Sequence, residues 1–206
     1  MITERDTIKC EAIFNDDKTH RLSWKRVWNK DKPLACVIML NPCHANTVLT
    51  DTTTALVVNN IARLDDYGGV IILNLFSFLT TKLNFRSEVN LNDYSNDTYI
   101  RKAAEEASVV ILAWGKSGDT NAKIYHRSQQ VVKLLQGQKE KLRVITDGIR
   151  MGLHPLCPSL RSQWLLTSVD EWIKESEEIA RKREEREAER RAAQNAPEAI
   201  KEASEA

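Results

Sequence analysis

Four short apolar runs rich in β-branched residues recur at regular intervals along the chain, and they constrain the fold more than any other feature. The runs span residues 34–40, 69–75, 108–114 and 142–146. Each run is nearly continuous rather than alternating, which is typical of strands covered on both faces. Segments with helical patterns separate them. This alternation predicts a three-layer α/β fold built on a four-stranded, mainly parallel sheet with right-handed crossovers.

The segments between the runs predict three helices. Asp51 is a suitable N-cap for the first helix, over residues 52–66. The second helix begins at Asn92 or Ser95, and the third covers about residues 120–136. Each places several apolar side chains on roughly one face, as a helix packed against a sheet requires.

Two further segments flank this α/β region. Residues 7–14 and 21–28 predict an N-terminal hairpin that lies on or beside the sheet. After residue 167 the sequence becomes strongly charged and helix-forming, with few large apolar side chains. We therefore expect one α/β domain over residues 1–167, followed by a charged helical tail over residues 168–206 whose end, beyond Pro197, is disordered.

Composition narrows the class of protein. Charged residues make up 29% of the chain and hydrophobic residues 42%, which suits a globular protein. The first residues carry charges in place of an apolar signal region, and no apolar run approaches the roughly 18 residues of a membrane-spanning helix. We expect a cytoplasmic protein with no membrane partner. Its four cysteines lack the close spacing of zinc or iron–sulfur ligands, so we expect reduced thiols and no metal or other cofactor.

The charge is unevenly distributed, although the whole chain carries only +1. Residues 170–206 hold 12 acidic and 8 basic side chains, whereas residues 1–169 hold 17 acidic and 22 basic ones. The net charge of +5 on the body permits a polyanionic partner such as nucleic acid. The charged run in the tail is typical of a solvated helix face.

Polar side chains follow each predicted strand, and in an open parallel sheet ligands bind at the carboxyl ends of the strands. Asn41 follows the first strand, Asn74 ends the second, and Trp114 leads to Lys116 after the third. His154 lies in the loop after the fourth strand. We expect these side chains to line one site.

Each of these residues also has a purely structural explanation. Asn41-Pro42 is a common turn at the end of a strand. Asn74 can be a buried amide paired within the fold, since an unpaired amide costs about 1–3 kcal/mol, and a lone histidine such as His154 is more often structural. The turn at residues 115–118 is similar to a phosphate-binding loop, but Val110 stands where that motif needs glycine.

The chain resembles a family of small bacterial and phage proteins called domain of unknown function 1643. The motifs that carry this resemblance are Arg21-Leu22-Ser23-Trp24, Leu40-Asn41-Pro42-Cys43-His44-Ala45, Asp51-Thr52-Thr53, Asn74-Leu75, Trp114-Gly115 and His154-Pro155-Leu156. Cys43 departs from the serine that the family usually has. The resemblance covers residues 20 to about 166 and implies no function.

A more distant resemblance is to the uracil-DNA glycosylase superfamily. In chain order, those enzymes have an acidic or Asn-Pro motif after the first parallel strand, an asparagine at the end of the next, a Trp-Gly turn and a His-Pro loop. This chain supplies MLNPCH at 39–44, IILN at 71–74, LAWGK at 112–116 and LHPLCPS at 153–159. It departs at Asn41, which replaces the acidic residue of the most active branch, and at the second proline of the histidine loop, displaced to Pro158.

This resemblance implies a monofunctional, metal-free DNA glycosylase that flips out a modified or damaged base and hydrolyses its N-glycosidic bond. It assigns water placement to Asn41 with help from Asp51, and hydrogen-bond donation in the transition state to His154. The other implied roles are base contacts by Asn74, Cys43, Phe76, Trp24 and Trp114, and DNA-phosphate contacts by Lys116, Arg150 and Arg161. Because Cys43 is far smaller than the tyrosine of the related motif, the pocket is expected to admit 5-substituted pyrimidines.

Two other classes of function stay open. A nucleic-acid or nucleotide-binding protein that has kept the pocket without catalysis is favoured by Asn41, whose amide accepts a proton poorly, whereas His154 favours the enzyme. A phosphoesterase needs clustered carboxylates for metal, and Asp51, Asp119 and Asp147 are scattered. We expect DNA as the partner of a monomeric protein.

Overall fold

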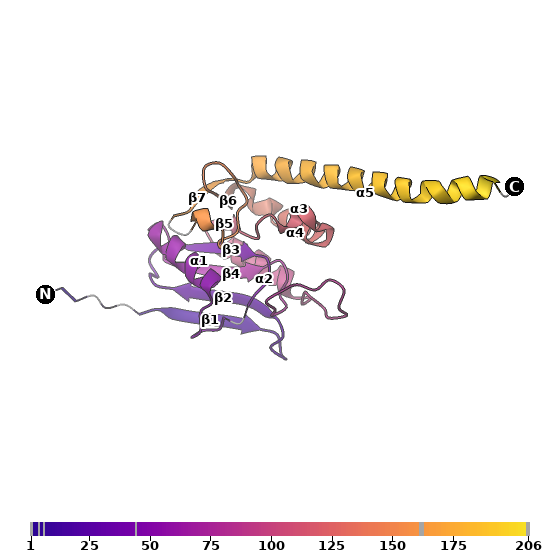
Figure 1. Cartoon of the computed structure of the whole chain (residues 1–206). Coiled ribbons are helices and arrows are strands. Elements are labelled where there is room, and N and C mark those ends of the chain that lie inside the picture. Colours follow the sequence, from indigo (N-terminus) through magenta and orange to yellow (C-terminus); the bar gives the residue numbers. More distant parts are fainter. Residues whose placement is uncertain (1, 4, 6, 44, 161–162, 205–206) are drawn as a thin grey trace.

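The computed structural model describes residues 2, 3, 5, 7–43, 45–160 and 163–204, with side chains up to residue 193. Within this part of the chain, a mixed seven-stranded sheet carries helices on both faces (Figure 1). The strands are β1 (Lys9–Phe14), β2 (Arg21–Val27), β3 (Leu34–Met39), β4 (Gly69–Asn74), β5 (Val109–Leu112), β6 (Leu142–Thr146) and β7 (Leu165–Ser168). The helices are α1 (Thr52–Arg63), α2 (Asn96–Glu106), α3 (Ser117–Thr120), α4 (Ala122–Leu134) and α5 (Asp170–Ser204), with short 3-10 helices η1 (Gln136–Lys141) and η2 (Pro158–Leu160).

The four apolar runs form the parallel centre of the sheet as β3, β4, β5 and β6. They pair in the order β4-β3-β5-β6, and each of these pairs is parallel. Their observed ends lie within about two residues of the predicted ones. The α/β class and the positions of these strands are therefore confirmed.

The sheet is larger than the four-stranded parallel sheet that the sequence predicts. The N-terminal hairpin joins it, because β2 pairs antiparallel with β4. At the opposite edge, β7 pairs antiparallel with β6. The sequence does not predict β7, because this strand has only four residues and none of them is fully buried.

Side chains alternate between the two faces of the sheet, and each face has its own core. On one face, Val37, Ile72 and Ile111 pack with α1 and with Trp24. On the other face, Ile38 and Leu73 pack with α2, α4 and the first turns of α5. Because both faces are covered, the strands are apolar along their whole length.

The helices form close to the predicted segments, with shorter ends. Asp51 caps α1 as expected, because its Oδ1 accepts a hydrogen bond from the Thr54 backbone N–H at 2.8 Å. The helix ends at Arg63, and Asp65 then takes a left-handed φ of 57° that a helix cannot continue. The third predicted helix, over about residues 120–136, corresponds to α4, which Asn121 caps; the single turn α3 before it was not predicted.

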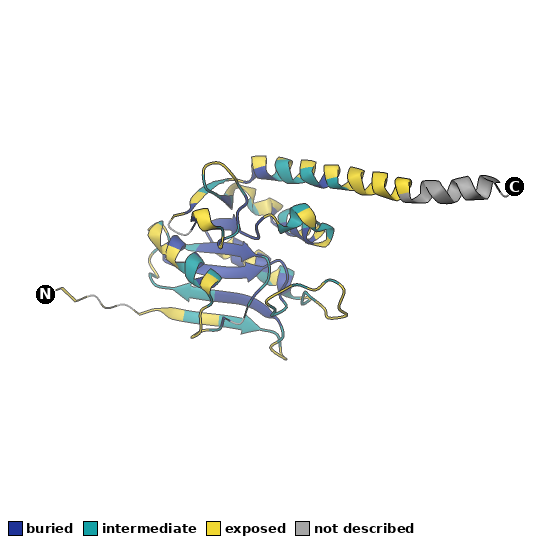
Figure 2. Ribbon diagram, viewed as in Figure 1, coloured by how far each residue is buried: buried dark blue, intermediate teal, exposed yellow. Residues whose placement is uncertain are grey.

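The charged tail begins as α5, and its first turns belong to the core. The side chain of Trp172 is 7% exposed, and its ring centroid lies 5.7 Å from that of Trp114. Arg183 donates to the Gly118 carbonyl oxygen at 2.8 Å and lies over the Tyr125 ring. Later turns of α5 are exposed and project beyond the sheet (Figure 2). The side chains of residues 194–206 lie outside the described part of the chain, so a disordered end stays a prediction.

No helix in the part of the chain described here has both the length and the apolar character needed to cross a bilayer.

Candidate functional site

The carboxyl ends of the parallel strands meet at one edge of the sheet, where the predicted polar residues lie. Met39 at the end of β3 pairs with Asn74 at the end of β4. Strand β3 lies between β4 and β5 in the sheet. Asn41, which follows β3, therefore lies between Asn74 at the end of β4 and Trp114 after β5. Adjacent strands are about 4.8 Å apart, so one small ligand can reach all three exits.

The side chain of Asn41 is held by the loop that follows β4. Its Nδ2 donates to the Thr80 carbonyl oxygen at 2.6 Å. The Thr80 backbone N–H in turn donates to the Pro42 carbonyl oxygen at 3.1 Å. Because the amide nitrogen faces a carbonyl group, the amide oxygen points elsewhere. Asn41 therefore offers a half-buried acceptor of defined direction.

His154 is held as a neutral ring with one nitrogen free to donate. The Leu156 backbone N–H donates to its Nδ1 at 3.2 Å, so the ring proton lies on Nε2. Burial lowers the pKa of His154 below its ordinary value of 6.5, which keeps the ring uncharged near neutral pH. Among the described residues, Nε2 has no hydrogen-bond partner.

The Trp114-Gly115 turn determines where His154 stands. Gly115 has a left-handed φ of 73°, and a Cβ at this position would lie 2.8 Å from the Cβ of His154. The turn therefore approaches the histidine loop so closely that only glycine fits. Trp114 is 3% exposed and packs on α5, so the tail also supports this turn.

The exit of β4 is held by side chains from α2 and α4. Asn96 donates to the Asn74 carbonyl oxygen at 3.1 Å. The Nε of Arg127 donates to the Leu75 carbonyl oxygen at 2.8 Å, while its guanidinium pairs with Asp97. These bonds position the Asn74 backbone and leave its side chain to other partners.

Sequence reasoning misses Arg21, which the pairing of β2 with β4 brings beside Asn74. Arg21 is 2% exposed and Asn74 is 1% exposed. The guanidinium donates to the Ala45 carbonyl oxygen at 3.2 Å and, more weakly, to Asn74 Oδ1 at 3.5 Å. The sequence signal is the place of Arg21 at the start of the motif Arg21-Leu22-Ser23-Trp24, but nothing in the sequence reveals which strand β2 joins.

Two predicted site residues lie near Arg21. Burial lowers the pKa of Arg21 to about 10, and the proximity of Asp51 and Cys43 partly opposes that change. Both carboxylate oxygens of Asp51 accept hydrogen bonds from Thr54, so its evident role is to cap α1. Cys43 is half-buried and carries a free thiol.

The three aromatic residues proposed to stack on a base lie in the core. Trp24 is fully buried, and its indole N–H donates to the Asn46 carbonyl oxygen at 2.9 Å. Phe76 is 7% exposed and packs edge-on against Phe85, with ring centroids 5.4 Å apart. Trp114 packs against α5, as described above. Stacking requires an accessible ring face, and none of the three rings offers one in this arrangement of the chain.

The cations proposed to contact DNA phosphates have carboxylate partners at the surface. Lys116 Nζ lies 3.3 Å from Glu175 Oε1 of α5. Arg150 is exposed, and its guanidinium lies 2.6 Å from the carboxylate of Asp147. The Lys116 pair is exposed and therefore weak, so Lys116 can exchange its carboxylate for a phosphate. The Asp147 side chain is only 11% exposed and also accepts hydrogen bonds from the Arg150 backbone N–H and from Ser159, so Arg150 is held more firmly. Arg161 lies outside the described residues.

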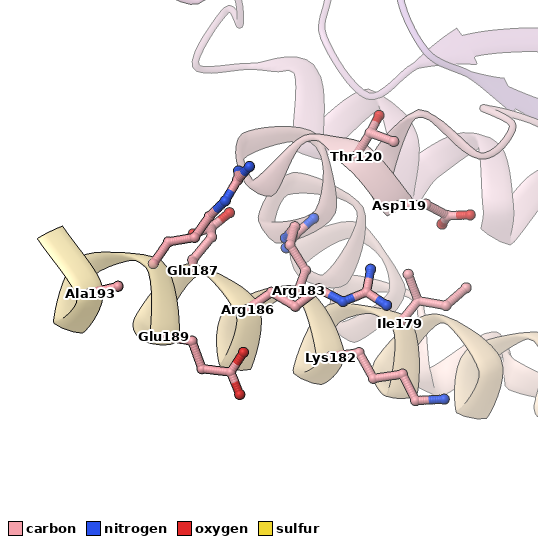
Figure 3. A pocket seen from close by; sticks show the side chains of 10 residues that line it. Asp119, Thr120, Ile179, Lys182, Arg183, Arg186, Glu187, Glu189 and Ala193 are labelled. Carbon is pink, nitrogen blue, oxygen red and sulfur yellow. The ribbon is translucent and has the colours of Figure 1, made fainter.

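A groove of about 970 Å³ runs between α5 and the α3–α4 corner, and none of the predicted site residues lines it (Figure 3). Lys182, Arg183 and Arg186 line it on α5, and Asp119 and Thr120 line it on the opposite side. We assign no ligand to this groove, because its charges are mixed and it is open to solvent. Over the described residues, no group of three or more His, Cys, Asp or Glu side chains is placed to hold a metal ion.

Comparison with known proteins gives one match. A family model described as "Protein of unknown function (DUF1643)" matches residues 21–156. This stretch is about two thirds of the chain and includes Arg21, Asn41, Asn74 and His154. No curated protein and no solved structure matches the chain significantly.

Proposed function

The chain belongs to the family described as Protein of unknown function (DUF1643), and we propose that it is a monofunctional DNA glycosylase that excises a modified or damaged base. The observation that carries the proposal is the state of His154. It is a half-buried, neutral imidazole whose Nε2–H has no acceptor in the described part of the chain. A preorganised donor of this kind suits a leaving group that becomes negatively charged.

The proposed reaction is hydrolysis of the bond between the sugar C1′ and the base nitrogen. That bond breaks with its electrons leaving on the base, while the sugar gains oxocarbenium character. A water oxygen then bonds to C1′ and loses a proton, and the base gains one. In this scheme the Nε2–H of His154 donates a hydrogen bond to the departing base and stabilises its charge without giving up the proton.

Asn41 is suited to position the water. Its amide nitrogen is occupied by the Thr80 carbonyl oxygen, so its oxygen is the group available to accept a hydrogen bond from water. An amide oxygen orients a water molecule but does not remove its proton. The proposal therefore relies on the oxocarbenium character of the sugar, which makes a strong nucleophile unnecessary.

Asn74 and Cys43 are the proposed determinants of the base. Asn74 Nδ2 is a buried donor without a partner among the described residues, which suits an oxygen or nitrogen acceptor on a base edge. Cys43 is small and half-buried, so it leaves room beside a pyrimidine ring. We infer that 5-substituted pyrimidines are the class of base most compatible with this pocket.

We also propose a distant fold relationship with the uracil-DNA glycosylase superfamily. The support is the order of the motifs along the chain, together with their common location at the carboxyl edge of parallel strands. The proposed fold relationship concerns only the parallel strands β3, β4, β5 and β6, and it does not extend to the antiparallel strands β2 and β7.

A second candidate function is nucleic-acid or nucleotide binding without catalysis. The observation that favours it is the absence of an evident general base among the described site residues. Asn41 cannot take a proton effectively, and Asp51, the nearby carboxylate, is engaged by Thr54 as a helix cap. Such a protein would flip or hold a base and not release it.

Single-turnover assays on oligonucleotides distinguish the two candidates. The full chain is incubated with single- and double-stranded DNA carrying unmodified, deaminated or 5-substituted bases, and abasic sites are revealed by alkaline cleavage. We expect base release by the wild type. In His154→Ala the rate should fall about 10²–10³-fold, the usual value of one transition-state donor, while DNA affinity stays nearly the same.

His126→Ala is the matched control, because His126 is an exposed histidine on α4. It should release base at the wild-type rate. If the wild type releases no base from any DNA tested, and wild type and His154→Ala bind DNA equally, the binding protein is the correct assignment.

A further inference from the structure

Two buried hydrogen-bond donors lie side by side without acceptors at the carboxyl edge of the sheet. Arg21 Nε and Asn74 Nδ2 are both shielded from solvent, and neither has a partner among the residues described. Their side chains are in contact, since the Arg21 guanidinium donates to Asn74 Oδ1 at 3.5 Å. Two unpaired donors in one place, on side chains at most 2% exposed, are unusual in a folded protein.

The charge of Arg21 is also incompletely neutralised. No carboxylate oxygen of the described residues lies within ion-pair distance of its guanidinium, whose hydrogen bonds go to a backbone carbonyl and an amide. Asp51 is near enough to affect it but directs its oxygens to Thr54. Burying a charge without a close counterion is strongly unfavourable. A fold that keeps such a residue is expected to use it for a ligand.

We propose that Arg21 and Asn74 form an oxyanion-binding subsite for the nucleotide held at this edge. Both free groups donate hydrogen bonds and one carries a positive charge, so the matching group has only acceptors and is negatively charged. A carboxylate on the base and a phosphate on the nucleotide share this chemistry. The identity of the ligand as a nucleotide rests on the proposed function, whereas the oxyanion preference rests on the two unpaired donors.

The segment 45–50 lies against this subsite. The Ala45 carbonyl oxygen accepts from Arg21, and that of Asn46 accepts from Trp24. Residues 47–50 are exposed, with Val48 at 83% and Leu49 at 65%. Ala45 itself is only 3% exposed, so an oxyanion that replaces its carbonyl oxygen as the acceptor of Arg21 must displace Ala45 from the protein interior.

Equilibrium binding tests the subsite without requiring catalysis. Fluorescence anisotropy compares labelled duplexes that are identical except for one 5-carboxylcytosine, 5-methylcytosine or cytosine. A second arm compares deoxycytidine monophosphate with deoxycytidine by the shift each causes in melting temperature. We expect the charged member of at least one pair to bind about 10–100-fold more tightly, the usual value of a charge-assisted hydrogen bond. The arm that responds identifies the source of the oxyanion.

Two variants separate recognition from folding. Arg21→Met removes the charge at similar length, and Asn74→Asp gives Arg21 a carboxylate of the same shape that competes with the ligand. Both should lose the preference for the charged ligand, and Asn74→Asp should melt no lower than the wild type because it neutralises Arg21. If Arg21→Met does not fold, Asn74→Asp alone decides.

The proposal is overturned if the wild type binds charged and uncharged ligands equally in both arms, or if Asn74→Asp keeps the preference. Base release is not part of this readout. If the wild type prefers the charged ligand but releases no base, the oxyanion subsite is supported and the glycosylase proposal is refuted.

Discussion

Replacing Trp172 by alanine tests whether the first turns of the charged tail are part of the folded domain. The indole is 7% exposed and packs against Trp114 with ring centroids 5.7 Å apart. It also fills the space above Gly152, where a Cβ would lie 2.1 Å from the indole Nε1. Truncating a buried tryptophan removes about 3–5 kcal/mol of stability. For a domain of this size, each kcal/mol lowers the melting temperature by about 2–4 °C, so a decrease of roughly 6–20 °C is expected.

Thermal unfolding followed by circular dichroism measures this decrease. Glu185→Ala is the matched control on the same helix, because Glu185 is exposed and makes a surface pair with Arg181; such a change shifts stability by at most about 0.5 kcal/mol. Removal of residues 194–206 should also leave the melting temperature nearly unchanged. If Trp172→Ala melts within about 2 °C of the control, α5 is not packed on the domain and the reasoning fails.

Three further predictions concern the site. Gly115→Ala places an alanine in a left-handed backbone conformation, which costs about 1–2 kcal/mol, and brings its Cβ against His154. Calorimetry should show a lower melting temperature than for the wild type. An unchanged melting temperature would contradict the close approach of Gly115 to His154. Burial lowers the pKa of His154 in the folded protein, so as the pH falls this histidine is protonated in the unfolded chain before it is protonated in the folded one. The contribution of His154 to the free energy of unfolding is therefore constant above about pH 6.5 and becomes unfavourable to folding as the pH falls below it. Melting temperatures at about pH 7.5 and 5.5 should therefore differ less in His154→Gln than in the wild type, with His126→Gln behaving like the wild type. Cys43→Tyr should selectively weaken binding of DNA with bulky 5-substituted pyrimidines, and an equal loss for all bases would count against a steric role.

The central strands were predictable because their physical requirement is local. A strand covered on both faces must be apolar along its whole length, and residues 34–40 and 69–75 show this directly in the sequence. The cap at Asp51 was predictable for the same reason, since a capping side chain bonds within its own first turn. Asn41 and Asn74 could be placed at one edge because parallel strands share their carboxyl ends.

The remaining features depend on pairings between distant segments. Arg21 enters the site only because β2 joins β4, and Trp172 enters the core only because α5 folds back over β5 and β6. The aromatic residues show the opposite case. Trp24 belongs to one of the sequence motifs and was expected to contact a base, yet its neighbours on the sheet bury it completely. The solvent exposure of an aromatic ring depends on how the whole domain packs and cannot be predicted from the local sequence.

The position of β4 between β2 and β3 has a consequence for how the protein is made. During synthesis, the hairpin of β1 and β2 has no partner in the sheet until β4 leaves the ribosome, and β3 likewise acquires its first neighbour only then. Arg21, Asn41 and Asn74 can therefore assemble cotranslationally as one unit within the N-terminal half of the chain. His154 joins this unit after β5 and β6 have been added, so the part of the site that contains Arg21, Asn41 and Asn74 can exist before the part that contains His154.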